Sequence, residues 1–530
     1  MIRRRFIKQL GLAGGAAFAP ALIRPLRAEW GDVPPSSALF TLGVASGDPT
    51  EHSVVLWTRL APDPLNGGGM QWPAVDVTWH VALDPAMHHT IREGSVVARQ
   101  SSGHAVSVHV SGLASDTWYY YQFHCRGTSS RIGRTRTFPK AGTLPHTMRF
   151  ALASCQDFES GYYAAYRDMC TQDLDFVVHV GDYIYEGAAH PNVPAERRHA
   201  GGELSSVRDY RDRYALYRLD PHLQNAHASF PFIVTWDDHE VDNNYAGPFP
   251  EDAQTTAAFL ERRANAYQVY EETMPLLSQV RQKDGSLSLF RSLRFGDLAE
   301  LMVLDTRQFR TDQPCGNNFQ FLQTCPDILS QDATALGEDQ ETWLFRRLKT
   351  SRAVWNVLAQ QVMMMRWDLG GLFGPNSALN LFNVDAWDGY QIARDRLTAH
   401  LAGKKLSNTV VLTGDIHSSW AADLKADFTD ANSPIVGAEF VCSGVTSVFG
   451  DAFVPLVAAT LPANPHIHFF DGLFRGYARC TVTPGSWRTD FRAVSRVPSA
   501  VFTVPSADIP LFDLASFRLA AGQPGLKRIF

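Results

Sequence analysis

Residues 176–186 read Phe-Val-Val-His-Val-Gly-Asp-Tyr-Ile-Tyr-Glu. The first five residues form a short, valine-rich run, which is typical of a strand buried on both faces of a parallel sheet. Gly181 and Asp182 follow directly, and Tyr185 comes three residues later. In open α/β sheets, ligands bind at the carboxyl ends of strands. The stretch therefore predicts a buried strand that presents a carboxylate and a phenol at a functional site.

Three other stretches have the same form, an apolar run followed at once by polar residues. The runs are Phe150–Ala153, Phe232–Trp236 and Val410–Thr413, and the motifs after them are Ser154-Cys155, Asp237-Asp238-His239-Glu240 and Gly414-Asp415-Ile416-His417. If all four runs are parallel strands, their loops converge on one crevice at a sheet edge. Thiolate, carboxylate, phenolate and imidazole together suit metal ions better than a covalent nucleophile. The number of ligands favours two metal ions over one.

Each motif also has a purely structural interpretation when it is taken alone. Cys155 would then be a small buried side chain, Asp182 a turn or helix-capping residue, and Tyr185 and His417 interior residues. The four polar residues Asp237, Asp238, His239 and Glu240 are harder to explain, because burying them costs several kcal/mol unless they are paired or bound to metal. Since a structural account must explain every motif separately, their joint occurrence favours the metal site.

The N-terminus carries the pattern of an export signal. Residues 3–8 match Arg-Arg-x-Phe-x-Lys, and the apolar stretch 10–23 that follows is too short to cross a bilayer stably. Cleavage is expected near Ala28. We predict a twin-arginine signal peptide over residues 1–28, recognition by the twin-arginine export machinery and a periplasmic or secreted protein. The alternative is an ordinary basic, apolar helix.

The composition is that of a globular chain. Its 530 residues, 45% of them hydrophobic, can bury a sizeable core and favour two or three domains. A formal charge of -6 and a pI near 6.3 argue against nucleic acid as a structural partner. No membrane span is expected in the mature protein. Among seven cysteines, Cys315 and Cys325 are candidates for one disulfide, whereas Cys155 should stay unpaired if it binds metal.

The pattern of apolar residues changes along the chain. Residues 39–139 alternate like strands and lack a long amphipathic helix, which predicts an all-β sandwich, and residues 113–121 resemble a turn and aromatic strand of fibronectin-like modules. From about residue 146, apolar runs alternate with helical periodicity. We therefore predict an α/β catalytic domain over residues 146–500, followed by a C-terminal tail over 501–530.

In combination, these motifs resemble the PhoD-like alkaline phosphatases, a branch of the metallophosphoesterase superfamily related to purple acid phosphatases. The similarity also includes Gly43–Pro49 and Val54–Arg59 in the first domain, and Leu304–Gln308 and Asp385–Tyr390 in the second. It implies an α/β fold in which an N-terminal fibronectin-like β-sandwich precedes a metallophosphoesterase-type αββα layered domain.

The resemblance also implies a centre of Fe³⁺ and Ca²⁺. Cys155 and Tyr185 are expected to bind iron through anionic donors, with His417 on the same side. Asp182 is expected to bridge the two ions, since a carboxylate has two oxygens.

Two carboxylates distinguish the calcium side. Asp238 and Asp415 stand where most superfamily members have Asn and His, and carboxylates at both places favour a hard cation such as calcium over zinc. Asn243 is a candidate for an additional oxygen ligand, with Asn244 as the alternative.

The implied reaction is phosphoester hydrolysis by metal-activated hydroxide, with Asp182 and His239 as the catalytic residues. His239 is expected to donate a proton to the leaving group or to stabilise phosphoryl charge; otherwise it orients a ligand. Arg307 is either a phosphate anchor or the partner of Asp305 in a surface ion pair.

The implied substrate is a small-molecule or lipid phosphoester. Alkaline phosphatase activity is the first expectation, and a phosphodiesterase or phospholipase D-type diester hydrolase is the alternative. A hypothesis from another class is a non-catalytic envelope protein that binds polyanions.

Overall fold

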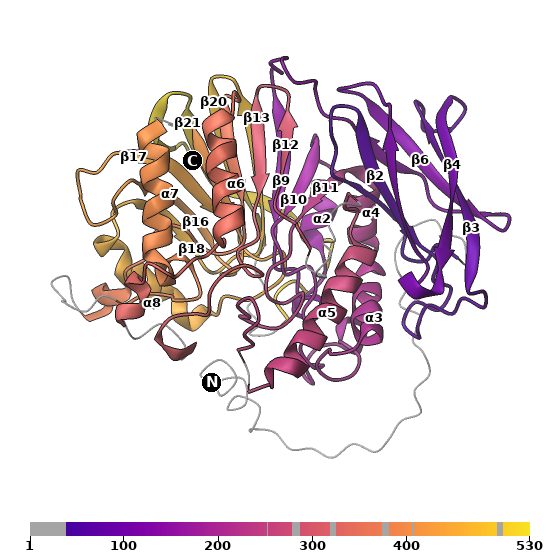
Figure 1. Ribbon diagram of the computed structural model, residues 1–530, viewed down its shortest axis with the longest axis horizontal. Helices are drawn as coiled ribbons and strands as arrows, with labels where there is room; N and C mark the ends of the chain where they lie inside the picture. The colour runs from indigo at the N-terminus through magenta and orange to yellow at the C-terminus, as the bar shows by residue number, and fades with distance from the viewer. Residues whose placement is uncertain are drawn as a thin grey trace.

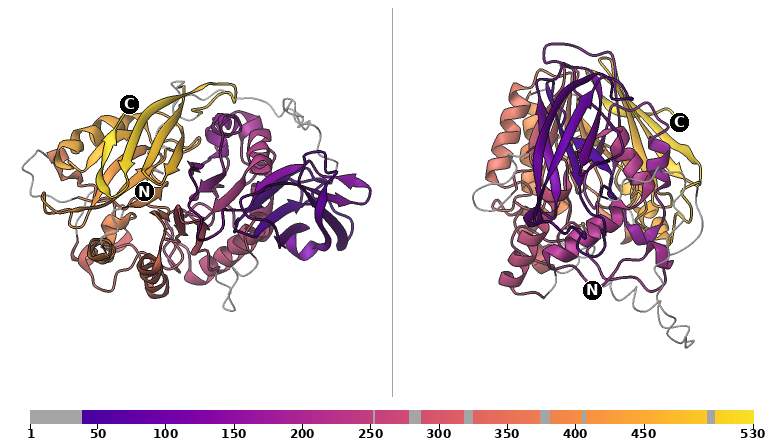
Figure 2. Two further views of the ribbon diagram at one scale, coloured as in Figure 1. Left: turned by 90° about the horizontal axis from the view of Figure 1, so that it is seen from above. Right: turned by 90° about the vertical axis from the view of Figure 1, so that its right-hand side faces the viewer.

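The computed structural model describes residues 39–251, 253–277, 287–317, 325–373, 381–404, 408–495 and 502–530 (Figure 1). The predicted signal peptide lies outside these residues. The N-terminal strands occupy one end of the molecule and the C-terminal strands lie toward the other (Figures 1 and 2). Among the described segments, no helix combines the length and the apolar character that a membrane span requires.

The largest sheet has ten strands in the order β22-β21-β20-β19-β9-β10-β11-β1-β2-β5. Their bounds are β1 Val44–Gly47, β2 Ser53–Arg59, β5 Ala105–Ser111, β9 Met148–Ala153, β10 Phe176–His179, β11 Pro231–Val234, β19 Gly476–Thr483, β20 Ser486–Val494, β21 Leu511–Ala520 and β22 Gln523–Arg528. Strands β9, β10 and β11 are parallel, with Val177 opposite Ala151 on one side and Phe232 on the other. Every residue of β10 and β11 is buried, as expected for strands covered on both faces.

A second sheet has seven strands in the order β12-β13-β14-β15-β17-β16-β18. Their bounds are β12 Arg291–Phe295, β13 Ala299–Val303, β14 Trp355–Ala359, β15 Thr409–Thr413, β16 Ser419–Lys425, β17 Ile435–Val441 and β18 Ile467–Asp471. Strand β15 precedes the Gly414-Asp415-Ile416-His417 motif. This motif therefore reaches the site from a different sheet than the other three motifs. The prediction of one shared sheet edge is wrong in this respect, because an apolar run marks a strand without specifying its sheet.

The two sheets share one apolar core. Phe150 and Val178 from the first sheet belong to the same buried cluster as Leu301, Val357 and Leu412 from the second. Burial at this interface fixes the two sheets against each other, so that loops from both reach the same place.

Helices pack against the other faces of these sheets. They are α2 Ala164–Met169, α3 Val207–Arg218, α4 Pro221–Ser229, α5 Thr256–Thr273, α6 Glu338–Thr350, α7 Gln391–Lys404 and α8 Val454–Thr460. Apolar residues of α2 to α5 cluster with Val177 of β10, whereas those of α6 and α7 cluster with Leu358 of β14. Helix α3 begins with a capping box in which Ser206 and Asp209 satisfy each other's backbone N–H groups.

The N-terminal region contributes strands to two sheets, and these strands enclose a core of their own. A five-stranded sheet contains β3 Ala74–Ala82, β4 Thr90–Arg99, β6 Trp118–Cys125, β7 Thr128–Ser129 and β8 Gly133–Arg136. Its apolar residues cluster with those of β1, β2 and β5. Strand β1 also pairs in parallel with β11, so the large sheet runs without a break from the N-terminal region into the second domain.

The C-terminal tail belongs to the large sheet. Strand β21 pairs with β20 and with β22, and the buried Phe517 packs in the core between the two large sheets. The boundary predicted between residues 500 and 501 therefore separates strands of a single sheet.

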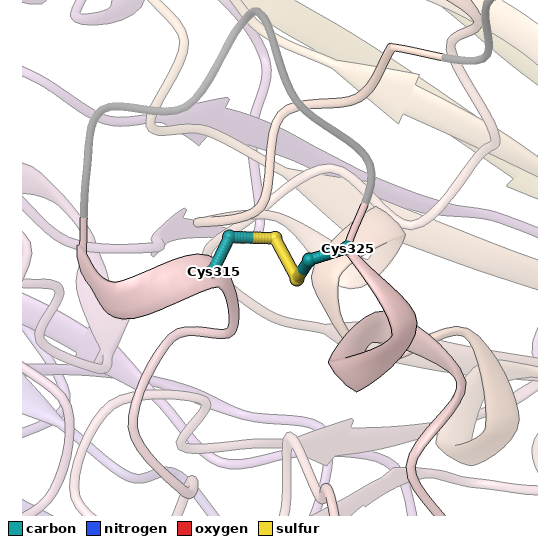
Figure 3. The surroundings of a disulfide bond; sticks show 2 residues. All are labelled: Cys315 and Cys325. Atoms are coloured by element: carbon teal, nitrogen blue, oxygen red, sulfur yellow. A yellow bond between two sulfur atoms is a disulfide. The ribbon is translucent and has the colours of Figure 1, made fainter.

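Cys315 and Cys325 form a disulfide bond (Figure 3). Both half-cystines pack beside Ile328, Phe382 and Val384. Five other cysteines are free, including Cys155, which agrees with its prediction as an unpaired residue.

Glu439 on β17 is a fully buried carboxyl group that faces the backbone N–H groups of Met364 and Met365 and the hydroxyl of Thr413. Burial raises its pKa to about 7, although these hydrogen bonds act in the opposite direction. The folded state therefore binds this proton more tightly than the unfolded state does. The resulting stabilisation is complete at low pH and is lost as the pH rises through about 7.

Replacing Glu439 with glutamine is expected to flatten the pH dependence of stability. The free energy of unfolding of the wild type should fall between pH 5 and pH 8 by an amount to which Glu439 contributes on the order of 3 kcal/mol. Urea unfolding at both pH values measures the difference, with the exposed Glu93→Gln as a matched control. The prediction is contradicted if the free energy of unfolding of Glu439→Gln falls between pH 5 and pH 8 by as much as that of the wild type.

Candidate metal centre

Loops after β9, β10 and β15 bring together the first group of candidate ligands. One ligand atom each from Cys155, Asp182 and His417 lies within 4.8 Å of the others. All three side chains are buried, and Cys155 and Asp182 are at most 1% exposed. The loops are also joined directly, because the Cys155 N–H donates to the carbonyl of Gly181 over 3.1 Å. The structure thus places a thiol, a carboxyl and an imidazole in one buried group.

Two further groups adjoin this one. Asp182, Asp238 and His239 form the second, and Asp237, Asp238 and Asp415 form the third, each with ligand atoms within 4.8 Å of one another. Asp182 is common to the first two groups and Asp238 to the last two. The predicted ligands therefore form a continuous row in which Asp182 lies between a sulfur-containing end and a carboxylate-rich end.

Buried carboxylate oxygens without a hydrogen bond also support metal binding, independently of which ligand types are present. Asp182 Oδ1 and Asp237 Oδ2 are buried carboxylate oxygens that accept no hydrogen bond in the described part of the chain. Asp238 Oδ1 accepts none either, but it has Nη2 of Arg307 as a compensating cation at 3.3 Å. Buried oxygens of this kind are costly unless a cation or a donor compensates them. A hard cation at the carboxylate-rich end would provide that compensation.

Tyr185 joins the first group through its hydroxyl. This hydroxyl donates to Asp182 Oδ2 over 2.9 Å and lies 3.0 Å from Nε2 of His417. It also accepts a hydrogen bond of 2.7 Å from Ser447, whose hydroxyl is 2.7 Å from the Cys155 carbonyl as well. The phenol oxygen is therefore positioned beside the other candidate ligands.

Four of these residues have an unusual backbone conformation. Cys155, Asp182, Asp415 and His417 adopt positive φ angles of 55°, 56°, 61° and 59°. Such conformations cost of order 1 kcal/mol or more for residues with a side chain and concentrate at functional sites. Gly181 precedes Asp182 for a steric reason, because a Cβ there would stand 2.3 Å from that of Asp237.

Glu240 connects the loops after β10 and β11. Its carboxylate accepts backbone hydrogen bonds from Asp182 at 3.0 Å, Tyr183 at 2.7 Å and Asp237 at 2.9 Å. The last residue of the Asp-Asp-His-Glu motif thus holds two candidate ligands in place through their main chain. Burial raises the pKa of Glu240 to about 7, against the effect of these three donors.

Arg307 lies among the carboxylates and has no exposed surface. Its guanidinium forms ion pairs with Asp237, with Asp385 at 2.9 Å, with Asp415 at 2.9 Å and with Asp238 at 3.3 Å. The predicted surface ion pair with Asp305 is wrong, since both residues are buried and the contact from Arg307 to the Asp305 carboxylate is a hydrogen bond from its backbone N–H. The role of phosphate anchor stays a prediction, and it would require the guanidinium to exchange carboxylate partners for phosphate oxygens.

Burial opposes ionisation of the candidate ligands at the sulfur-containing end. It is the main cause that raises the pKa values of the Cys155 thiol, the Asp182 carboxyl and the Tyr185 phenol well above their usual ranges, and neighbouring negative charges add to the effect. Metal ligands must be deprotonated. A cation bound here would therefore displace protons that the site otherwise retains.

His239 has the opposite tendency. Burial alone would lower its pKa, but the negative charges of Glu186, Asp238 and Asp182 outweigh burial and raise the pKa well above its usual value. Its Nδ1 lies 2.7 Å from Oε2 of Glu186, and its ring packs against that of Tyr185 with a centroid distance of 4.1 Å and a tilt of 32°. The imidazole is thus held beside the candidate ligands, and its protonated form is favoured.

The two asparagines after the Asp-Asp-His-Glu motif contact a carboxylate through their side chains. The side-chain amides of both Asn243 and Asn244 donate to Glu251, and the backbone N–H of Asn244 donates to Asp238 over 2.6 Å. The assignment of Asn243 as a metal ligand stays a prediction.

Comparison with known proteins identifies the family. The profile of the PhoD-like phosphatase family matches residues 150–491, and that of the PhoD-like phosphatase N-terminal domain matches residues 27–139. The chain belongs to the PhoD-like phosphatases. This PhoD-like phosphatase is 44% identical to alkaline phosphatase D of Bacillus subtilis (strain 168), over 99% of this chain and 89% of the relative. It superposes on a solved structure described as "Structure of PhoD" with a TM-score of 0.87, 44% identity and coverage of 93% of each chain.

The family assignment confirms that the protein is a phosphoester hydrolase, as the resemblance implied, and the groups of candidate ligands agree with metal binding. The structure adds residues that the sequence reasoning did not select, namely Asp237, Glu186, Glu240, Asp385 and Ser447. All of them except Ser447 could have been selected from the sequence, because they lie in or beside the quoted motifs. Ser447 follows no motif, and only the fold brings it to Tyr185.

Proposed function

We propose that this PhoD-like phosphatase is an alkaline phosphatase that holds Fe³⁺ at the sulfur-containing end of its site and Ca²⁺ at the carboxylate-rich end. The observation that carries the proposal is the position of Asp182, which belongs to both neighbouring groups of ligand atoms. The sulfur, phenol and imidazole donors suit a ferric ion, whereas the cluster of carboxylates suits calcium. We also propose that the chain folds as a fibronectin-like sandwich followed by a metallophosphoesterase-type αββα domain.

The ligands divide between the two ends. Cys155, Tyr185 and His417 would hold iron, Asp238 and Asp415 would hold calcium, and Asp182 would contribute to both. When bound, the cations lower the pKa of water and neutralise charge on the phosphoryl oxygens.

His239 would act on the leaving group of the substrate. Glu186 engages Nδ1 of His239, which leaves Nε2 to hold a proton and donate it to the departing oxygen. Glu186 is itself fixed, because its other oxygen accepts the backbone N–H of Asn243 over 3.1 Å. The negative charge of Glu186, the largest of the charges that raise the pKa of His239, favours the protonated imidazole.

Replacing Glu186 with glutamine tests this pairing. We expect kcat for an alkyl phosphate to fall by about 10- to 100-fold, the range typical for loss of a residue that orients a functional side chain. The fall for p-nitrophenyl phosphate should be much smaller, because its leaving group needs little protonation. An equal loss for both substrates would show that Glu186 has only a structural role.

The location is a separate part of the proposal and rests on the N-terminal sequence. We propose that residues 1–28 direct export of the folded protein through the twin-arginine machinery to the periplasm or beyond. Expression with Arg3 and Arg4 replaced by lysine should leave active enzyme inside the cell, whereas unchanged export would contradict the assignment.

Elemental analysis of the purified protein, combined with a phosphatase assay, tests the metal assignment. We expect iron near one per chain together with calcium, and we expect Cys155→Ala to lose iron and activity. The buried Cys480→Ala is the matched control and should retain both. Zinc or manganese alone would keep the hydrolase but overturn the ligand roles. Absence of metal would overturn the metal assignment. Comparing p-nitrophenyl phosphate with its bis ester distinguishes monoester from diester preference.

A further inference from the structure

A cavity of about 260 Å³ lies where the N-terminal region meets α3. It is lined by Arg59, Asn66, Gly67, Met70, Gln100, Gly103, His104, Arg208, Arg211 and Asp212. None of these residues belongs to the groups of candidate metal ligands. Arg59 ends β2, within a motif that the sequence analysis singled out and that the metal centre does not use. The function of this motif is therefore open.

Arg59 is a buried guanidinium without a carboxylate partner. Its side chain is about 97% buried, since the residue is 3% exposed, and within the described ranges no carboxylate forms an ion pair with it. Its Nε donates to the Gly103 carbonyl over 2.9 Å and its Nη1 to the Arg211 carbonyl over 3.2 Å. Its Nη2 donates to no protein group among the described residues. A buried cation in this state is costly unless an anion compensates it.

Both positive and negative charges surround Arg59. Burial and the adjacent Arg211 guanidinium together lower its pKa to about 10, whereas the carboxylates of Glu272 and Asp212 act in the opposite direction. Arg211 is bound on one side by Glu272 through two hydrogen bonds of 2.7 Å, and Arg208 is 70% exposed at the mouth of the cavity. Asp212 is the one carboxylate in the lining, and it is engaged by Arg208 at 3.5 Å and by the backbone N–H of Gly67 at 3.3 Å.

Glycines allow the main chain to approach these arginines. The loop over residues 66–69 reads Asn-Gly-Gly-Gly, and each glycine has a positive φ angle. A Cβ at Gly103 would stand 2.9 Å from Nε of Arg211, whereas one at Gly68 would make only an ordinary contact of 3.6 Å with Nη2 of Arg59. The lining therefore combines three arginines with two glycines and with neutral polar side chains such as Asn66 and Gln100, and the arginines suit a small oxyanion.

We propose that this cavity binds inorganic phosphate at a second site, separate from the metal centre, with Arg59 as the buried anchor and Arg208 and Arg211 as additional donors. Guanidinium groups match tetrahedral oxyanions because their planar N–H groups bind two oxygens at once. The site does not depend on the proposed metals, since its residues lie outside the three ligand groups.

The cavity and the metal centre are connected through α3. Arg211 and Asp212 line the cavity, and the next residue, Arg213, donates to the Tyr185 carbonyl. One turn further, the Tyr217 hydroxyl accepts the Tyr185 backbone N–H over 3.1 Å. The helix that contributes to the phosphate site thus also holds a residue of the metal centre.

Equilibrium dialysis with radiolabelled inorganic phosphate tests the proposal. An Asp182→Asn background weakens binding at the metal centre, so that binding at the cavity is seen alone. We expect about one phosphate per chain to remain in this background. Adding Arg208→Glu should weaken that binding at least tenfold. Arg346→Glu makes the same change of charge on an exposed residue of α6 and should leave binding unaltered.

A second variant addresses the buried anchor. Arg59→Lys in the same background keeps the charge and should weaken phosphate binding, because lysine cannot present a planar pair of donors. If Arg59→Lys does not fold, the Arg208→Glu result decides alone. The proposal is overturned if the Asp182→Asn protein binds no phosphate, or if Arg208→Glu and Arg346→Glu bind it equally well. If the metal assignment fails, the elemental analysis will show it. The phosphate-binding result can still be interpreted in that case, because the cavity residues lie outside the groups of candidate ligands.

Discussion

Replacing Asp182 with asparagine is expected to lower kcat/KM for phosphoester hydrolysis by about a thousandfold or more, equivalent to ~4 kcal/mol of transition-state stabilisation. Asp182 belongs to both the group with Cys155 and His417 and the group with Asp238 and His239. An amide cannot supply two anionic oxygens, so the change affects both ends of the site at once. Steady-state kinetics and metal analysis of the same preparation measure the effect.

Stability separates this result from misfolding. Burial raises the pKa of Asp182 well above its usual value, and the nearby carboxylates raise it further. Removing the ionisable group should therefore leave the metal-free protein at least as stable as the metal-free wild type. Asp173 lies before the same strand β10 with an 88% exposed side chain, and Asp173→Asn is the matched control for activity. Full activity in Asp182→Asn would reject the shared-ligand assignment.

The strands that carry the site were predictable because their burial is encoded locally. The runs before Asp182 and Asp238 are apolar apart from His179 and Thr235, and such runs are typical of strands covered on both faces. Their order in the sheets was not predictable. Strand β15 pairs with β14 and β17 rather than with β9, and nothing in residues 409–413 distinguishes these partners.

Elements with weak local patterns escaped prediction. Strand β4 is largely exposed and contains charged residues, because it lies at the edge of the five-stranded sheet. Helix α4 has nine residues and follows α3 after a single turn, where Asp220 caps it and Pro221 begins it. In both cases tertiary packing rather than periodicity stabilises the element.

The chemistry of the site was predictable to the same extent as the strands. Residues directly after buried runs, such as Cys155 and His417, meet as expected because the runs deliver them. Arg307 illustrates the limit, since its partner Asp385 is 78 residues away and lies on a loop without a strand before it. Whether a guanidinium meets phosphate or carboxylates depends on such distant contacts, which spacing does not encode.

Arg307→Gln is the second change for which we expect a large effect, and the effect is on stability. In the metal-free protein, the substitution removes the cation that Asp237, Asp238, Asp385 and Asp415 share, although Asp385 keeps its ion pair with Arg310 at 2.6 Å. Loss of one partner from a buried ion pair typically costs about 3–5 kcal/mol. Arg307 lowers the pKa values of Asp237, Asp238 and Asp385, although burial acts to raise them. Without it, the carboxyl groups should take up protons at higher pH.

The sign of the pH dependence follows from this argument. The loss of stability in Arg307→Gln should be largest near pH 8, where all four carboxyl groups must ionise, and smaller near pH 5, where protonation relieves their repulsion. Urea unfolding of the wild type, Arg307→Gln and the exposed control Arg346→Gln measures it. If Arg307 serves instead as a phosphate anchor with little structural weight, Arg307→Gln will keep wild-type stability and show only a raised KM. These outcomes distinguish a cation that assembles the carboxylates from one that binds substrate.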